Sequence, residues 1–247
     1  MKIGTWRLLG AAVFVFLAPA LARAGEGVYI EEKIVSPAMM GEPERVEIVR
    51  TWLLGDGLMR QDGRDGKETI LFRLAEKRVI VIDHDADTYV EIPLDRFAEV
   101  GAMRLSMYTR RDQGGRETVP TPLFKKTGRV RRIGKWRCYE VEVQGDPLLG
   151  AKPIQWIATY TGLDAHVYAR LFAIPLGGKV PEIRRAIVDQ MVALGGYPVK
   201  TVLSRSLGKP SIAKTQTVEV LQKREIDKSV FEVPEGYAKV EMPEPPK

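Results

Sequence analysis

Short runs in which apolar and polar residues alternate constrain the fold of this chain more than any other feature. Between residues 28 and 35, Val28, Ile30 and Ile34 have one parity, and Glu31 and Lys33 have the other. Such alternation is typical of a β-strand with one buried face. Similar runs at residues 46–54, 58–60, 69–74, 78–83 and 88–92 are separated by turn sequences such as Gly55-Asp56-Gly57. These runs predict a meander of antiparallel strands.

Helical periodicity interrupts this pattern at residues 94–108, 164–174 and 181–194. The last segment is the clearest, because Pro181 suits a first helical turn and Gly195-Gly196 suits a C-cap. Alternation returns in residues 128–133, 136–143, 154–160, 199–204, 215–224 and 237–241. About ten strands with two or three helices predict an α+β fold. A sheet of this size has to curl, so we expect a curved antiparallel half-closed barrel wrapped around the helices.

Residues 1–24 have the pattern of a secretory signal peptide. Two basic residues, Lys2 and Arg7, precede an apolar run at residues 8–17, and Ala22-Arg23-Ala24 offers a small-x-small cleavage sequence. The run is shorter than the roughly 20 residues that span a bilayer. We expect cleavage after Ala24, a location in the periplasm, and a single domain over residues 25–247 with a loose tail at 243–247.

Composition disfavours several classes of function. Loss of residues 1–24 removes three basic residues and no acidic one, which lowers the net charge from +6 to +3. This balance does not indicate a nucleic-acid-binding protein. The basic clusters at residues 110–111, 125–126 and 129–132 fit a solvated face, and contact with anionic lipid head groups remains an alternative.

Candidates for catalysis or metal binding are few. Cys138 is the single cysteine and His84 and His166 are the only histidines, which excludes a disulfide framework and leaves little for a metal centre or a Ser-His-Asp relay. The turn Asp83-His84-Asp85-Ala86-Asp87 contains potential cation ligands, but Asp-rich turns cap their own backbone without a metal. We therefore expect no enzyme activity, no cofactor and no metal site.

Four segments contain distinctive sequence motifs. They are the C-terminal stretch Lys223–Tyr237 with its Phe-Glu-Val-Pro-Glu-Gly-Tyr ending, Gly195–Lys200 (GGYPVK), Gly134–Val141 (GKWRCYEV), and the Asp83–Pro93 hairpin. Taken in chain order, these motifs resemble motifs of the periplasmic LolA/LolB-like superfamily, especially those of its outer-membrane lipoprotein-sorting-like members and its domain-of-unknown-function relatives. The resemblance covers most of residues 28–242. The chain departs from the carrier itself in a longer middle and an additional helical insert. The resemblance does not place the carrier's functional arginine on a particular residue, so the carrier's exact activity is not transferred.

The resemblance implies a curved sheet around an apolar cavity, which in characterised relatives shelters lipoprotein acyl chains. Large apolar side chains that would line such a cavity, or fill it as core, are Trp52, Leu54, Met59, Phe97, Met103, Met107 and Trp156. We expect a monomeric, non-enzymatic periplasmic carrier that binds an acyl chain, a lipid or a lipoprotein. A protein partner in the outer or inner membrane stays open, as does the alternative of an envelope sensor or assembly module with a filled core.

Overall fold

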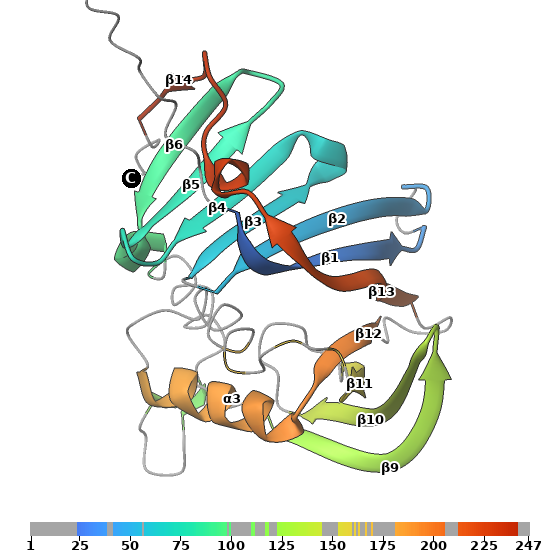
Figure 1. Ribbon diagram of the computed structural model, residues 1–247. Helices are drawn as coiled ribbons and strands as arrows, with labels where there is room; N and C mark the ends of the chain where they lie inside the picture. Colours follow the sequence, from blue (N-terminus) through green and yellow to red (C-terminus); the bar gives the residue numbers. More distant parts are fainter. Residues whose placement is uncertain are drawn as a thin grey trace, which may run out of the picture.

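Twelve strands form one large sheet in the computed structural model (Figure 1). The structure describes residues 24–38, 42–55, 57–97, 99, 110–111, 117–118, 123–144, 153–159, 161, 163, 166, 169, 181–205 and 212–241. The strands of the sheet, in chain order, are β1 (Gly25–Ser36), β2 (Arg45–Leu54), β3 (Leu58–Gly63), β4 (Glu68–Arg73), β5 (Arg78–Asp83), β6 (Thr88–Pro93), β9 (Leu123–Ile133), β10 (Trp136–Gln144), β11 (Ile154–Ala158), β12 (Tyr197–Arg205), β13 (Ile212–Ile226) and β14 (Ala238–Lys239). Outside it lie the paired short strands β7 (Arg110–Arg111) and β8 (Glu117–Thr118), the 3-10 turns η1 (Arg64–Gly66) and η3 (Lys228–Phe231), and the helix α3 (Pro181–Leu194).

The sheet order is β14-β6-β5-β4-β3-β2-β1-β13-β12-β11-β10-β9. Strands β1 to β6 follow one another as an antiparallel meander, as the alternation predicts. The short β14 is the exception to the antiparallel pairing, since it runs parallel to β6. Among the described strands, β14 and β9 end the order without pairing with each other, so the sheet is unclosed.

The structure corrects the expected balance of strand and helix. The sheet has twelve strands rather than about ten, and the protein is mostly β in its described part rather than an even α+β mixture. The predicted helix at 181–194 is confirmed as α3, and Gly195 follows it with a positive φ of 66° that suits a C-cap. Residues 94–97 begin a helical turn. Most of the other predicted helical residues, at 98–108 and 164–174, lie outside the described residues.

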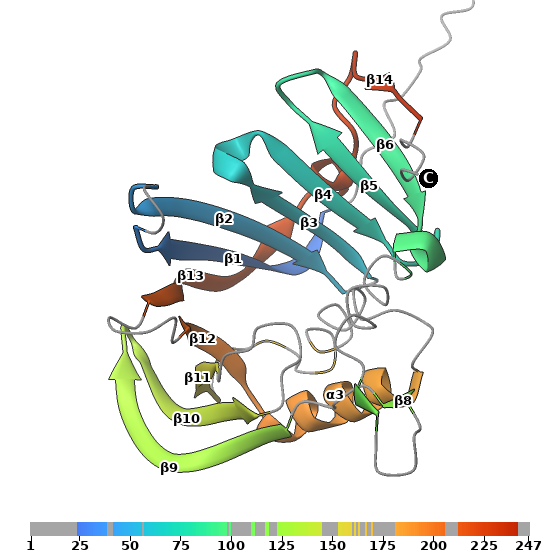
Figure 2. The ribbon, with the colours of Figure 1, turned by 180° about the vertical axis from the view of Figure 1, so that it is seen from behind.

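Strand β13 joins two parts of the sheet. It pairs with β12 through residues 212–217 and with β1 through residues 215–226. Figures 1 and 2 show β1–β6 on one side of it and β9–β12 with α3 on the other. In the described part of the chain, no helix combines the length and the apolar character needed to cross a bilayer.

The sheet has two apolar faces, which we name after one residue on each. The Trp156 face holds the largest cluster of buried side chains: Ile30, Leu53, Phe72, Val79, Trp136, Cys138, Trp156, Ala158, Tyr197, Val199, Val218 and Leu221. The Phe231 face lies opposite and holds Leu54, Leu71, Ile80, Ile82, Ile226 and Phe231. Neighbours such as Leu53 and Leu54 belong to different faces because side chains alternate along a strand.

Helix α3 packs against the sheet on the side opposite the Trp156 face. Its last residue, Leu194, contacts Val141 and Ile157, which alternate with members of the Trp156 face along β10 and β11. The Tyr139 hydroxyl donates a hydrogen bond to the main-chain oxygen of Leu194. Burial raises the pKa of Tyr139 to about 12, so the phenol keeps the proton that this hydrogen bond needs.

Candidate functional site

The Trp156 face is the most extensive apolar surface of the sheet. The neighbouring strands β5-β4-β3-β2-β1-β13-β12-β11-β10 all contribute side chains to it. The contribution of β3 is Met59, at the border of the face, and the other strands contribute to the buried cluster. Phe97 packs on this face from outside the sheet, with its ring 5.5 Å from that of Phe72 and at 89° to it. Leu94 and Leu163 also pack there from outside the sheet.

Apolar side chains at the border of this face keep part of their surface exposed. They are Val28, Met59, Ile70, Leu74, Leu94, Phe97, Ile133, Ile154 and Leu163. The central residues are nearly inaccessible, with Trp156 at 6% exposure. An apolar ligand would therefore meet the border side chains first, and Trp156 would need to shift to make full contact.

The structure divides the residues expected to line a cavity. Met59, Phe97 and Trp156 lie together on the Trp156 face. Trp52 and Leu54 do not join them, because both pack in the cluster of the Phe231 face. Met103 and Met107 lie outside the described residues.

Trp52 and Leu54 have structural partners on their own face. The Trp52 ring lies 5.2 Å from that of Tyr29, and the guanidinium of Arg60 lies 5.4 Å from its centroid. Leu54 is 5% exposed and packs with Ile226 and Phe231. These contacts assign both side chains to packing between the sheet and the C-terminal segment.

A buried carboxyl group, that of Glu32, lies on the Trp156 face among apolar side chains that the alternation predicts. Glu32 is 7% exposed, and its Oε1 accepts a hydrogen bond from the Tyr197 hydroxyl at 3.3 Å. Burial raises the pKa of Glu32, and hydrogen bonds from Gln216 and Tyr197 oppose that rise. The strand parity of Val28 and Ile30 already assigns Glu32 to the apolar face, so the signal was present in the sequence.

The raised pKa of Glu32 makes stability depend on pH. The unfolded chain releases this proton near the ordinary value of 4.5 and the folded chain releases it at higher pH. Stability therefore falls as pH rises between those two values, because the folded state binds more protons there. We expect Glu32→Gln to be more stable than the native chain by about 1 kcal/mol above that window, or about 2–4 °C in Tm.

Thermal unfolding at a series of pH values checks this expectation. The gain of Glu32→Gln should disappear below the ordinary pKa, where both states of the native chain are protonated. A gain of equal size at every pH would show that charge burial is not its cause.

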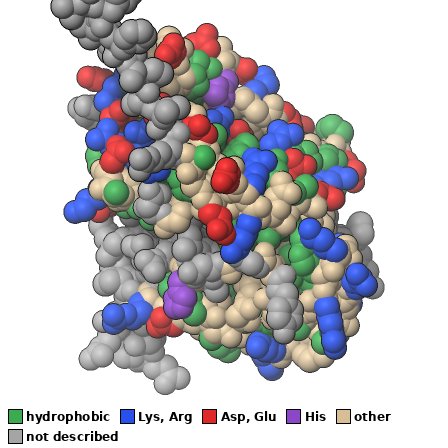
Figure 3. Space-filling view, in the orientation of Figure 1, with side chains coloured by type: hydrophobic (Ala, Val, Ile, Leu, Met, Phe, Trp, Pro, Cys, Tyr) green, Lys and Arg blue, Asp and Glu red, His purple; other side chains and the backbone are tan. Residues whose placement is uncertain are grey.

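Cations gather at the β9 border of the Trp156 face, and Figure 3 shows Lys and Arg side chains over this part of the molecule. The Arg131 guanidinium lies 3.7 Å from the centroid of the Trp156 ring. The Glu140 carboxylate is buried, and it accepts from Arg129 and from the Thr127 hydroxyl. One buried acid is thus paired, and a second acid of β10, Glu142, lies directly opposite Lys125 in the β9–β10 pairing.

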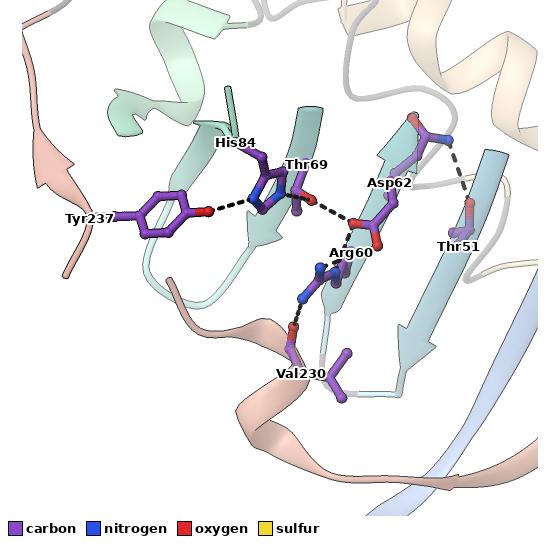
Figure 4. A network of polar contacts seen from close by, with 8 residues as sticks. Thr51, Arg60, Asp62, Thr69, His84, Val230 and Tyr237 are labelled. Carbon is purple, nitrogen blue, oxygen red and sulfur yellow. Dashed lines mark hydrogen bonds and ion pairs between the residues drawn. The ribbon is translucent and has the colours of Figure 1, made fainter. Parts of the chain in front are cut away.

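The Phe231 face carries a chain of polar contacts (Figure 4). Arg60 pairs with Asp62 through Nε at 2.8 Å and Nη2 at 3.2 Å. The Thr69 hydroxyl donates to Asp62 at 2.6 Å and lies 2.9 Å from Nε2 of His84. Since Thr69 has only one hydroxyl proton, it accepts the second bond from Nε2–H of His84. Nδ1 of His84 lies 2.9 Å from the Tyr237 hydroxyl, which donates to it when the ring is neutral.

This network fastens the C-terminal segment to the sheet. Arg60 donates to the main-chain oxygen of Val230 at 2.9 Å, and Arg73 donates to that of Phe231 at 2.8 Å. Thr69 is fully buried and its proton is already engaged by Asp62, so it is not presented as a nucleophile. The arrangement holds η3 and the segment that leads into β14 against the sheet.

The acidic turn between β5 and β6 also has its own protein partners. The Asp83 carboxylate accepts from the main-chain amides of Asp85 and Ala86, at 3.0 and 3.2 Å, and Asp85 pairs with Lys67 at 2.8 Å. Within the described residues, no group of three or more His, Cys, Asp and Glu side chains is placed to hold a metal ion. The interpretation of this segment as a self-capped turn is confirmed by the Asp83 contacts.

Comparisons with known proteins give distant structural similarities. No family model and no curated protein matches the chain. The structure of PNGF-II is similar with a TM-score of 0.41 and 10% identity, over 88% of this chain and 31% of that one, so the chain spans about a third of that protein. A LolA superfamily protein from Nitrosomonas europaea gives a TM-score of 0.34 and 10% identity, over 83% of this chain and 90% of that one. An outer membrane lipoprotein-sorting protein domain from Vibrio parahaemolyticus gives a TM-score of 0.31 and 11% identity, over 84% of this chain and 89% of that one.

LolA-superfamily structures are thus among those that this chain is similar to, in agreement with the resemblance of its sequence motifs. All three TM-scores are below 0.5, and the identities are 10–11%.

Proposed function

We propose that the chain is a non-enzymatic periplasmic carrier that holds an acyl chain, free or as part of a lipid or lipoprotein, against the Trp156 face. The observation that carries the proposal is the continuous apolar surface from β5 to β10 with partly exposed side chains along its border. The signal-peptide pattern of residues 1–24 supports export to a compartment bounded by membranes.

The energy of acyl-chain burial is sufficient for such a role. Each buried CH₂ group contributes about 0.8 kcal/mol, so about ten of them would give about 8 kcal/mol, a micromolar affinity. The flexible side chain of methionine adapts to irregular apolar partners, and Met59 lies with the large apolar rings of Phe97 and Trp156 on one face. Of the seven residues expected to line a cavity, these three are the ones that the proposal retains.

Two neighbouring residues of β3 provide a matched test. Met59 and Leu58 are both half-buried and apolar, but Met59 lies on the Trp156 face and Leu58 packs on the Phe231 face. We expect Met59→Gln to weaken uptake of a fluorescent fatty acid about 5- to 30-fold, since it replaces about 1–2 kcal/mol of apolar contact. Leu58→Gln should disturb packing similarly and leave binding within about twofold.

Equal loss of fatty-acid binding in both variants would contradict a site on the Trp156 face, because the effect would then follow stability alone. If the delipidated native chain takes up no fatty acid at all, the carrier proposal is wrong. Recovery of a protein partner by cross-linking, together with that result, would favour the sensor or assembly module with a filled core.

A further inference from the structure

Strand β9 is a long edge strand with unusually exposed side chains. It covers eleven residues, Leu123–Ile133, and its single neighbour among the described strands is β10. Eight of those eleven residues are exposed and the other three are half-buried, on both sides of the strand. An edge of this kind offers both its side chains and its outward main-chain groups to a partner.

The charged side chains of β9 itself are all cations. Between Leu123 and Tyr139 there are seven cations and no acidic residue: Lys125, Lys126, Arg129, Arg131, Arg132, Lys135 and Arg137. Of the two acids that follow on β10, Glu140 is buried and paired with Arg129, and Glu142 is half-buried and lies directly opposite Lys125. Figure 3 shows the resulting group of Lys and Arg side chains on the part of the surface formed by β9 and β10. We name these seven residues the β9 basic edge.

Protection against aggregation explains only part of this pattern. Charged residues, lysine above all, commonly keep an edge strand from pairing with other chains. That role does not explain why two large aliphatic side chains are exposed among the cations. Leu123 is 53% exposed and Val130 is 54% exposed, and they are two of the four most exposed large hydrophobic residues in the described chain.

The aromatic residues of this region bear on which anionic partner fits. Cations of the chain itself lie over three rings: Lys126 over Tyr139 at 4.7 Å, Arg131 over Trp156 at 3.7 Å and Lys135 over Trp136 at 5.0 Å. Rings covered in this way are not presented for stacking with nucleic-acid bases. Cations with interspersed aliphatic side chains instead match an anionic bilayer surface, where charge meets the head groups and aliphatic groups enter the interface.

We propose that the β9 basic edge docks the protein on anionic lipid membranes. Each Lys or Arg near such a surface contributes about 1 kcal/mol within a Debye length of about 10 Å at 0.1 M salt. When the free edge of β9 faces the membrane, the cations on both sides of the strand reach the membrane surface together. Membrane docking uses the charged side chains of β9 and β10, whereas acyl-chain binding uses the apolar side chains of the Trp156 face; the two meet where Arg131 lies over Trp156.

The test is flotation of the full chain with vesicles of phosphatidylcholine alone or mixed with phosphatidylglycerol. We expect binding only to the mixed vesicles and its loss at about 1 M salt, where the Debye length is about 3 Å. The triple variant Lys125→Gln, Arg132→Gln and Arg137→Gln should bind about 100-fold more weakly, since it loses about 3 kcal/mol. It leaves the Arg129–Glu140 and Arg131–Trp156 contacts in place.

The matched control removes three exposed cations elsewhere, Arg45→Gln, Lys77→Gln and Arg96→Gln, with the same change in net charge. If membrane binding depends on the position of the cations and not on the total charge, this control should bind the mixed vesicles within about threefold of the native chain. Equal weakening by both triple variants, or no binding to mixed vesicles, would overturn the proposal. So would binding of an acidic peptide or of DNA that the β9 variant loses while vesicle binding is unchanged.

Discussion

Replacing Phe231 with alanine is expected to lower the free energy of unfolding by about 3–5 kcal/mol, the usual cost of removing a buried phenylalanine ring. Phe231 is 2% exposed and packs with Leu54 and Ile226 where the C-terminal segment meets the sheet. Its loss should also loosen η3, whose main-chain oxygens accept hydrogen bonds from Arg60 and Arg73. The network of Figure 4 would then hold the segment without its main apolar contact.

Urea unfolding followed by tryptophan fluorescence measures this effect. Ser229→Ala is the matched control in the same 3-10 turn, because its side chain is exposed and its capping contacts are made by main-chain atoms. It should change the free energy of unfolding by less than about 0.5 kcal/mol. A similarly small change for Phe231→Ala would show that the C-terminal segment is not part of the core.

The second large effect is expected for Gly196→Ala, at about 2–4 kcal/mol of destabilisation. A Cβ atom at position 196 would lie 2.3 Å from the main-chain oxygen of Ala158 and 2.9 Å from Cγ2 of Ile157. Gly196 connects α3 to β12, and the next residue, Tyr197, pairs directly with Ala158. The backbone there cannot yield without moving β11 and β12 apart, which would disturb both faces of the sheet.

Gly55→Ala is the control for this substitution. A Cβ at position 55 meets nothing within 4 Å, so we expect a change within about 0.5 kcal/mol. Urea midpoints of the two variants give the comparison. If Gly196→Ala were as stable as Gly55→Ala, the result would contradict the close contact between the α3–β12 connection and β11.

The sequence was sufficient to predict the elements with strong local signals. Alternation between Val28 and Ile92, the turn at Gly55–Gly57 and the self-capping turn at Asp83–Asp87 together specify the β1–β6 meander. Helix α3 was equally clear, since its apolar spacing, Pro181 and Gly195 all agree. Consistency among such local signals is what makes an element predictable.

Elements without alternation were missed or predicted too short. β9 begins at Leu123 rather than Gly128, because an edge strand exposed on both sides shows no apolar period. The pairing of β14 with β6 and the 3-10 turn η3 depend on contacts distant in sequence, such as Arg73 with Phe231. Local pattern does not encode contacts of this kind.

The main limit in predicting the site was the assignment of side chains to one face of the sheet or the other. Trp52, Leu53 and Leu54 are consecutive and all apolar, so parity alone does not say which of them belongs to which face. The structure assigns Leu53 to the Trp156 face and the other two to the Phe231 face, because the C-terminal segment covers that second side of the sheet. A sheet covered on both sides loses the polar alternation that would reveal its inner residues.

Native mass spectrometry of the full chain, purified without detergent from the cells that produce it, tests acyl-chain carriage most directly. We expect a population whose mass exceeds that of the polypeptide by one acyl-bearing molecule, and we expect that population to be much smaller in Met59→Gln but not in Leu58→Gln. Only the mass of the bare polypeptide, both as purified and after incubation with fatty acid, would contradict the account.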